Sequence, residues 1–396
     1  MRILYGFSNC TDKKYDELMR GKSVSILRPD QKYHGLLIKG LAENGADIKC
    51  FSGLPVNRSL TKKVFIRETD ERENGVYYHY ISSVNLPIFR QLSVFLGSFF
   101  GVLKAKKTAD TYVICDCLNI ANAYGMLLAA KVKRIPVITI VTDLPDMLSQ
   151  GGILRRINNN FFKSADGFIL LTEQMNARVN AKAKPFIVLE GHVDGGLSTV
   201  NPANKTEAVS GIRQIVYAGS VNEIYGIKNL VDGFILANLD NCELCVFGTG
   251  DYVDELEKSA QKYSSVKVMG VCENSAVVSA EQKAALLVNP RPSAPEYTMY
   301  SFPSKNMEYM VSGTPVLTTK LPGMPEEYHR YVYLLEDETP MGVSDSLREI
   351  FSLSFEERNK KGAAARKFVL ENKSSVIQAK KIIDFLKEVK VWPKNI

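Results

Sequence analysis

The sequence lacks long apolar segments, a full set of metal-ligand cysteines and any strong compositional bias. No stretch of about twenty apolar residues occurs, so no helix that spans a bilayer is expected. Among seven cysteines only Cys242 and Cys245 form a Cys-x-x-Cys pair, and without a second pair a zinc site is not expected. No repeat or low-complexity tract occurs, and the basic residues form no cluster interleaved with aromatic ones, which argues against nucleic-acid binding. The scattered cysteines suit a reducing cytoplasm.

What is present is the composition of a globular protein with an uneven distribution of charge. Of 396 residues, 45% are hydrophobic and 23% are charged, which is enough for two cores and predicts two domains. Residues 1–200 hold 27 Lys or Arg against 18 Asp or Glu, whereas residues 201–396 hold 23 against 25. The basic first half predicts an anionic partner surface on that side. The start, Met1–Tyr5, is interpreted as a strand that runs into Gly6 and not as a signal peptide.

Short apolar runs alternate with longer helical patterns along the chain, which predicts an α/β fold with doubly wound parallel sheets. After a polar segment, 202–214, the alternation restarts at Ile215–Gly219. We therefore expect one domain over 1–203, a second over 204–373, and a terminal amphipathic helix within 374–396. In the first domain the strands are expected at 2–6, 46–51, 76–81, 111–115, 136–141, 167–171 and 186–190.

One segment, residues 291–316, combines a polar loop with the start of a helix. It follows Leu286–Val288, which has the pattern of a buried strand. Ser301 is expected to cap the helix, with Pro303 in the first turn, where the missing N–H of proline has no cost. Gly313 is expected to end the helix. The buried stripe of the helix is expected to consist of Met307, Met310 and Val311.

The start of this helix has the chemistry of a nucleoside diphosphate site. Free backbone N–H groups and the positive end of the helix dipole attract an anion. Lys305 adds a formal charge in the first turn, and Glu308 lies one turn deeper on the same face. A carboxylate would repel a phosphate, but it can accept two hydrogen bonds from the vicinal diol of a ribose. The alternative is a surface Glu–Lys pair on an ordinary helix.

The same segment resembles the donor-binding signature of family 4 glycosyltransferases of the GT-B fold, commonly Glu-Gly-Phe-Gly, four residues, then Glu-Ala-Met-Ala-x-Gly-x-Pro-Val. In this chain it stands as YSFP at 300–303 and EYMVSGTPV at 308–316. The resemblance implies two Rossmann-like domains that face each other across a cleft, with the terminal helix packed back on the first. It assigns the ribose to Glu308. Tyr300 replaces the glutamate that holds donor sugar hydroxyls in the family, and Glu296 is a candidate to take over that role.

Two cations that grip the donor diphosphate in the family are missing from this chain. Ser220, which follows Gly219, stands at the position of the family's Arg, and Tyr225 stands at the position of its Lys. Lys305 and Arg291 are basic residues able to replace them, which would move the charge from the first loop of the domain to the last. The remaining donor-binding candidates are Ser304, Gly248 and Thr249, the last two in a glycine turn that resembles the family's second.

The resemblance assigns the acceptor to the first domain. Asp143 follows a β-branched strand at a turn where many family members carry a histidine, often followed by Asp; here the pair is Thr142-Asp143. Asp143 is the catalytic candidate, which would accept the proton of the acceptor hydroxyl or orient that hydroxyl. The alternative is a helix N-cap. Thr142 and His192 are candidates for lining the cleft, although a lone histidine in a turn is more often structural. In the family the loop corresponding to 7–31, here rich in basic residues, faces the acceptor.

The most apolar helix-like run is SVFLGSFFGVL, residues 93–103, with Arg90 before it and three lysines closely after it. One interpretation is a helix packed on the sheet. The other is an interfacial anchor, with aromatic side chains in the lipid boundary and lysines on anionic head groups. The two interpretations are compatible.

These features together predict a glycosyltransferase that moves a sugar from a nucleoside diphosphate sugar to a hydroxyl of a lipid-linked glycan in cell-surface polysaccharide synthesis. No Asp-x-Asp pair occurs, so no metal is expected, and no other cofactor. The family mostly retains the anomeric configuration. The expected partners are the nucleotide sugar, the acceptor and an anionic membrane, which places the protein on the inner face of the plasma membrane. The alternatives are a sugar-nucleotide epimerase on the same fold and a catalytically silent binding subunit of a polysaccharide assembly complex.

Overall fold

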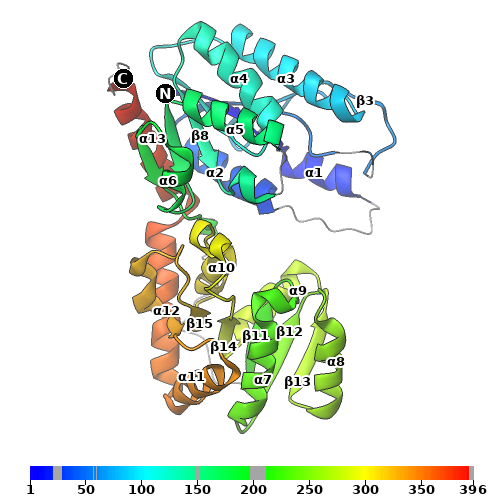
Figure 1. Cartoon of the computed structure of the whole chain (residues 1–396), viewed down its shortest axis with the longest axis vertical. Coiled ribbons are helices and arrows are strands. Elements are labelled where there is room, and N and C mark those ends of the chain that lie inside the picture. The colour runs from blue at the N-terminus through cyan, green and yellow to red at the C-terminus, as the bar shows by residue number, and fades with distance from the viewer. Residues whose placement is uncertain (21–28, 57, 59, 149–151, 197–210, 392–396) are drawn as a thin grey trace. The chain divides into compact units, whose positions relative to one another are not determined.

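The computed structural model describes the chain except residues 21–28, 57, 59, 149–151, 197–210 and 392–396. The chain divides into two compact units (Figure 1). Unit 1 comprises Met1–His192 and Ser375–Ile396, and unit 2 comprises Val193–Ser374. The expected boundary between residues 203 and 204 lies outside the described residues. Among the described residues, no helix is long and apolar enough to cross a membrane.

Unit 1 contains an eight-stranded sheet in the order β10-β9-β8-β7-β1-β2-β5-β4, in which only the β4–β5 pair is antiparallel. Its strands are β1 Arg2–Gly6, β2 Asp47–Ser52, β4 Glu71–Glu73, β5 Val76–Tyr80, β7 Thr111–Asp116, β8 Val137–Val141, β9 Gly167–Leu170 and β10 Phe186–Val188. The strands expected from the sequence are confirmed to within two residues at either end. Three short ones were not expected: β4, and the separate pair β3 Phe65–Ile66 and β6 Ser83–Val84.

Helices cover both faces of this sheet. On one face, α2 (Pro29–Glu43) and the terminal helix α13 (Ser375–Val391) pack against each other over a core that includes Ile3 and Tyr5 of β1. On the other face α3 (Pro87–Lys104) packs against α4 (Ile120–Lys133). The segment 7–31 is not only a loop, because α1 (Asp12–Met19) lies within it. The remaining helices are η1 Pro145–Leu148, α5 Gly152–Ser164 and α6 Met175–Val179.

Unit 2 contains a six-stranded, fully parallel sheet in the order β13-β12-β11-β14-β15-β16. Cys242 and Cys245 lie in its strand β12, and both are buried. The strands are β11 Arg213–Ala218, β12 Cys242–Phe247, β13 Val266–Gly270, β14 Leu286–Asn289, β15 Val316–Thr319 and β16 Tyr333–Leu335. The helices are η4 Glu223–Tyr225, α7 Ile227–Ala237, α8 Val253–Lys262, α9 Asn274–Lys283, η5 Glu296–Tyr300, α10 Ser304–Ser312, η6 Glu326–Tyr331, α11 Pro340–Ser352 and α12 Phe355–Asn372.

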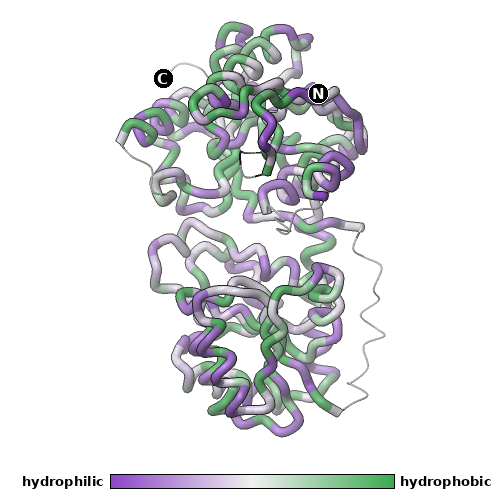
Figure 2. Tube along the Cα trace, turned by 90° about the vertical axis from the view of Figure 1, so that its right-hand side faces the viewer, coloured by the Kyte–Doolittle hydropathy of each residue, from purple (hydrophilic) through white to green (hydrophobic). Residues whose placement is uncertain are grey.

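The core of unit 2 explains why its strands read as continuous apolar runs. Every described parallel strand away from the sheet edges is covered on both faces, so consecutive residues are buried and the sequence does not alternate. Ile215 and Leu244 pack with Phe234 of α7 and Leu347 of α11 in one cluster. Hydrophobic residues appear as green stretches of the trace within each unit in Figure 2.

Candidate functional site

The first strand of unit 2, β11, lies inside its sheet between β12 and β14. From β11 the chain continues to β12 and β13 on one side of this strand, and it then crosses to β14 and β15 on the other side. The connections that follow β11 and β14 therefore lead to opposite sides of the sheet. Ligands of doubly wound sheets bind at such a switch point. The two loops touch here: a Cβ on Gly226, whose φ is +80°, would lie 2.1 Å from the carbonyl oxygen of Pro290. Only glycine allows this approach.

Helix α10 starts beside this point. It begins at Ser304, after Pro303, and its N-cap residue makes no side-chain hydrogen bond. The predicted Ser301 cap is therefore wrong, because the Ser301 hydroxyl instead accepts a hydrogen bond from Arg291 Nη1 at 3.3 Å. Without a side-chain cap, the positive end of the helix remains available to an anion. The predicted end at Gly313 (φ 74°) and the buried stripe of Met307, Met310 and Val311 are confirmed.

Lys305 and Glu308 pair with each other on the first turns of α10. The Lys305 ammonium lies 2.9 Å from Glu308 Oε2 and 3.8 Å from Glu281 Oε1 of α9. Glu281 is buried, whereas the other two side chains are partly exposed. Burial alone would lower the pKa of Lys305, but Glu308 and Glu281 together raise it above its ordinary value. Lys305 is thus a charged bridge between two carboxylates, and the Glu–Lys surface pair considered above is part of this arrangement.

Arg291 is held between two aromatic rings. Its guanidinium lies 5.7 Å from the ring centroid of Tyr225 and 4.8 Å from that of Tyr297. Tyr225, in the loop after β11, stands where the resemblance expects a lysine. Arg291, in the loop after β14, therefore brings a positive charge close to the position of the missing lysine. Arg291 Nε and the Tyr297 hydroxyl are buried, and neither has a hydrogen-bond partner among the described residues. Buried polar groups of this kind are rare unless a ligand or water completes them.

The turn that contains Gly248 and Thr249 packs against the loop after β11. A Cβ on Gly248 would lie 1.8 Å from the carbonyl oxygen of Gly219, so the glycine permits a backbone contact. The Gly219 N–H donates to Phe247 O at 3.0 Å, and the Val221 N–H donates to Thr249 O at 2.9 Å. Ser220 is exposed and its carbonyl accepts from the Tyr217 hydroxyl at 2.7 Å. The four predicted residues Gly219, Ser220, Gly248 and Thr249 therefore lie close together at one edge of the sheet.

Two residues that fix α10 were missed by the sequence analysis. The hydroxyl of Tyr309 accepts a hydrogen bond from Ala218 N at 2.8 Å, which ties α10 to the end of β11. Asn306 accepts from Asn289 Nδ2 at 2.8 Å and donates to Thr318 Oγ1 at 3.0 Å. Tyr309 stands at an alanine of the family signature, and a buried hydroxyl there requires a partner. The tyrosine at this alanine position was the feature of the sequence from which the contact could have been predicted.

The other donor candidates lie before and at the start of α10. Tyr300 and Glu296 are the two ends of η5, and Glu296 is exposed. Ser304 is the first residue of α10 and is exposed. Glu338 fixes the loop between β14 and η5, because its two carboxylate oxygens accept hydrogen bonds from Ser293 N at 3.0 and 3.1 Å.

In unit 1, Asp143 and the half-buried Thr142 follow β8, and Asp143 is exposed. The neighbouring strand β7 ends at Asp116, a buried residue that the sequence analysis missed. Burial raises the pKa of Asp116 to about 6, although hydrogen bonds from Asn119 and Leu118 N act to lower it. Asp143 also raises this pKa by repulsion. Asp116 ends an apolar run, which is the same signal that identified Asp143.

His192 has a structural partner within unit 1. Its Nε2 donates to the carbonyl oxygen of Tyr33 at 2.7 Å, and its ring lies 4.5 Å from the Tyr33 ring. Burial lowers the pKa of His192 to about 4. The imidazole is thus neutral and joins the end of unit 1 to α2.

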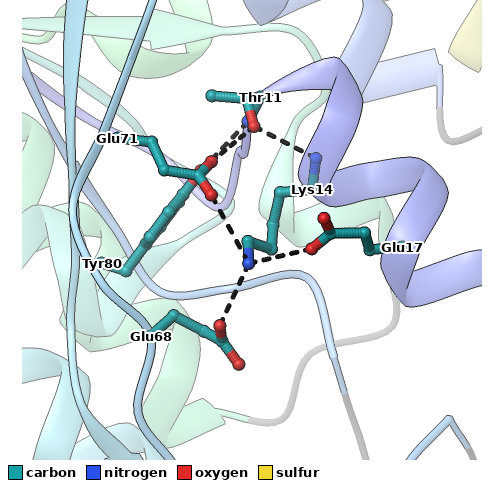
Figure 3. A network of polar contacts seen from close by, with 6 residues as sticks. All are labelled: Thr11, Lys14, Glu17, Glu68, Glu71 and Tyr80. Atoms are coloured by element: carbon teal, nitrogen blue, oxygen red, sulfur yellow. Dashed lines mark hydrogen bonds and ion pairs between the residues drawn. The ribbon is translucent and has the colours of Figure 1, made fainter.

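The basic residues expected to face an acceptor include one that is fully engaged. Lys14 of α1 contacts the carboxylates of Glu17 and Glu68 at 3.1 Å and of Glu71 at 3.5 Å (Figure 3). Thr11 and Tyr80 both donate to Glu71, at 2.6 and 3.0 Å. Burial alone would lower the pKa of Lys14, but its hydrogen bonds to Glu17 and Glu68 raise it. Lys14 therefore holds α1 against β4 and β5 and is not presented to a ligand. Lys22 and Arg28 lie outside the described residues.

The comparisons with known proteins agree with the expected family. Residues 203–368 match the model of the family described as "Glycosyl transferases group 1". HepE from Anabaena, solved in complex with UDP, has a TM-score of 0.67 at 14% identity over 98% of this chain and 100% of its own. Sucrose-phosphate synthase from Thermosynechococcus elongatus gives 0.69 at 12% identity over 98% and 99%. A glycosyltransferase from Rickettsia africae gives 0.67 at 14% identity over 99% of both chains. A comparison with curated sequences finds no match.

Likeness at these identities shows the fold, and the family model matches the part of the chain that contains most of unit 2. The predicted α/β architecture of two Rossmann-like parallel sheets is confirmed, as is the prediction of a glycosyltransferase at the level of family and fold. This chain therefore has the GT-B fold as a whole, and its residues 203–368 match the model of the glycosyl transferases group 1 family.

Proposed function

We propose that the protein transfers a sugar from a nucleoside diphosphate sugar to a hydroxyl of a lipid-linked glycan during cell-surface polysaccharide synthesis. The observation that carries the donor half of this proposal is the uncapped start of α10 at the switch point of unit 2, with Arg291 beside it and Glu308 one turn deeper. HepE, which has the same fold, is solved with UDP and with UDP-glucose.

The donor would lie along the first turns of α10. Its diphosphate would meet the helix N-terminus, Ser304 and the Arg291 guanidinium, which carries charge into the place of the lost lysine. Its ribose diol would be held by Glu308, as in family 4 members. The nucleotide would pass the glycine turn at Gly219, Ser220, Gly248 and Thr249. Tyr300 and Glu296 would contact the donor sugar.

Unit 1 would supply the acceptor site. Asp143, which is exposed at the end of β8, would accept or orient the proton of the attacking hydroxyl. The leaving diphosphate would be stabilised by fixed positive groups, which act where charge develops. Because these groups come from the protein, we expect transfer that needs no divalent metal. We also propose retention of the anomeric configuration, as in most of family 4, and a place at the inner face of the plasma membrane, where lipid-linked acceptors are found.

The first experiment is a panel of nucleotides and nucleotide sugars tested for thermal stabilisation of the full chain. A ligand at 100 times its Kd adds about 2.7 kcal/mol to the free energy of unfolding. We expect a nucleoside diphosphate and the corresponding nucleotide sugar to stabilise the chain more than any nucleoside monophosphate does. If no nucleotide stabilises the chain, the donor assignment is wrong. Epimerisation of the donor sugar without an acceptor would instead favour the epimerase, and binding without any turnover would favour the silent subunit.

A second experiment concerns Asp143. The Asp143→Asn variant should lose acceptor-dependent transfer by about two to four orders of magnitude, the usual contribution of a general base, while donor affinity stays unchanged. Asp47→Asn, at an exposed aspartate that begins the parallel strand β2 and so lies at the opposite end of the sheet of unit 1, is the matched control. Transfer by Asp143→Asn at the wild-type rate would remove Asp143 from the mechanism.

A further inference from the structure

Helix α3 packs on the sheet of unit 1 with its small residues. Val94, Ser98 and Val102 are its buried residues. A Cβ on Gly97 would lie 2.3 Å from Cγ2 of Ile81, and one on Gly101 would lie 2.6 Å from Cε1 of Phe51. The helix therefore approaches the sheet closely, and its inward face has no room for larger side chains. The packed-helix interpretation of residues 93–103 is confirmed for this face.

The large apolar side chains of α3 point the other way. Ile88, Leu92, Leu96 and Phe100 repeat every four residues, and their exposed fractions run from 41% for Leu96 to 82% for Ile88. Phe89 is exposed beside them at 60%. A helix that packs its glycines closely against its neighbours and exposes large apolar side chains reverses the usual arrangement of a surface helix. Contiguous apolar surface of this kind on a soluble protein marks an interaction site.

The charged residues within α3 and the two helices that follow it all have one sign. Helices α3, α4 and α5 together contain seven Lys or Arg and no Asp or Glu. Lys104, at the end of α3, and Arg155 and Arg156, at the start of α5, are exposed. The neighbouring helices also expose apolar residues, namely Leu128 and Val132 of α4 and Ile153 and Leu154 of α5.

We propose that the outward face of α3, consisting of Ile88, Phe89, Leu92, Leu96 and Phe100, inserts into the interfacial region of an anionic bilayer. Apolar side chains would enter the acyl boundary, while the exposed Lys104, Arg155 and Arg156 contact lipid phosphates. A second copy of the chain fits less well, because a two-fold interface places the same surface on both partners and would bring these positive charges together. Figure 1 shows α3, α4 and α5 near one another in unit 1.

This inference assigns the membrane contact to a particular surface, and it deepens the proposed use of a lipid-linked acceptor. It does not depend on donor binding, which is proposed for unit 2. Vesicle binding and nucleotide binding are thus separate measurements on the same protein, and failure of one leaves the other standing.

The test is flotation of the full-length protein with vesicles of phosphatidylcholine alone or mixed with phosphatidylglycerol. The wild type should float with the mixed vesicles, and less so at high salt. Leu92→Ser combined with Phe100→Ser should reduce the vesicle-bound fraction at least about tenfold. Leu236→Ser combined with Met341→Ser removes two equally exposed apolar residues from unit 2 and should float like the wild type. Thermal unfolding of each variant checks that its fold is retained.

A fluorescent probe reports insertion directly. Trp392 is the only tryptophan of the chain, so Leu96→Trp in a Trp392→Phe background places the single indole on the outward face of α3. Its emission should shift to shorter wavelength with the mixed vesicles and be quenched by brominated lipid. The proposal is overturned if the wild type stays with the unbound fraction, if the double α3 variant floats equally well, or if the probe shows no shift. A dimer in solution that the α3 variant makes monomeric, without vesicle binding, would assign this face to a second copy.

Discussion

At the scale of single residues, Lys305 has two possible roles that the structure makes separable. The sequence analysis assigned it to the diphosphate, whereas the structure places its ammonium between Glu308 and Glu281. In that position Lys305 can act through Glu308, by fixing the carboxylate that we propose to hold the ribose. A lysine that bridges two carboxylates also keeps them from repelling each other.

We expect Lys305→Met to weaken UDP binding by about one to two orders of magnitude, because it removes an interaction of about 1.5–3 kcal/mol. Titration calorimetry with UDP and with 2′,3′-dideoxy-UDP separates the two roles. If Lys305 acts through Glu308, the substitution should matter for UDP but hardly for the analogue without the diol. An equal loss for both ligands would assign Lys305 to the diphosphate, and no loss for either would remove it from the site.

Arg291 is a stronger candidate than Lys305 for binding the diphosphate, because its Nε is buried and has no hydrogen-bond partner among the described residues. Arg291→Gln should weaken UDP binding by about one to two orders of magnitude and UMP binding much less. Arg213→Gln is the control, because Arg213 also lies over an aromatic ring, 4.9 Å from the centroid of Phe351, in the same unit. Equal losses for UDP and UMP would place the guanidinium on the α-phosphate or the nucleoside.

At the scale of elements, the network around Lys14 decides how α1 is held. The Lys14 side chain is 11% exposed and contacts three carboxylates, so its removal leaves their charges close together. Lys14→Met should lower the free energy of unfolding by about 2–4 kcal/mol. This value is near the lower limit for the loss of one partner of a buried ion pair, because the three carboxylates remain accessible to water. Urea unfolding measures the change. The exposed neighbour Lys13→Met should cost little; if the two variants are equally stable, the network does not anchor α1.

The elements also show what the sequence could and could not predict. The parallel strands were predictable because burial on both faces leaves apolar runs, and the end of α10 was predictable because Gly313 takes a left-handed conformation. The start of α10 was not predictable, because Arg291 donates a hydrogen bond to the Ser301 hydroxyl. The two residues are ten positions apart, and no local sequence pattern indicates their contact. The pairing of Lys305 with Glu281 of another helix was hidden for the same reason.

At the scale of the molecule, the two units differ in how far their function could be predicted. The family match covers 203–368, while the likeness to solved structures covers 98% of the chain. The proposed donor site consists of a helix start and glycine turns, whose backbone requirements leave a sequence signature. The proposed acceptor site depends on loop side chains of unit 1, which leave no such signature, and the buried environment of a residue such as Asp116 is set by the tertiary structure.

Unit 1 should also respond to acid through two histidines with low pKa values. Burial lowers the pKa of His34 to about 3 and that of His192 to about 4. The folded unit therefore keeps both rings neutral, whereas the unfolded chain takes up protons below its ordinary histidine pKa of about 6.5. The stabilisation is complete above that pH and is lost as the pH falls toward 4 and then 3. Between pH 7 and 5, each histidine should lower the free energy of unfolding by about 2 kcal/mol.

Asp116 acts in the opposite direction over the same interval. Its folded pKa of about 6 exceeds that of an unfolded aspartate, so the folded state binds a proton first and gains stability as the pH falls from 7 to 5. The pH dependence of the wild type alone is therefore ambiguous, and the comparison must be with a variant. His34→Gln should remove about 2 kcal/mol of the change between pH 7 and 5, measured in the full chain by hydrogen exchange of the β1 amides across a urea series. His79→Gln, at a more exposed histidine on β5, serves as the control. If the His34→Gln variant keeps the pH dependence of the wild type, the His34 ring is not held neutral by its burial between Tyr5 and Phe7.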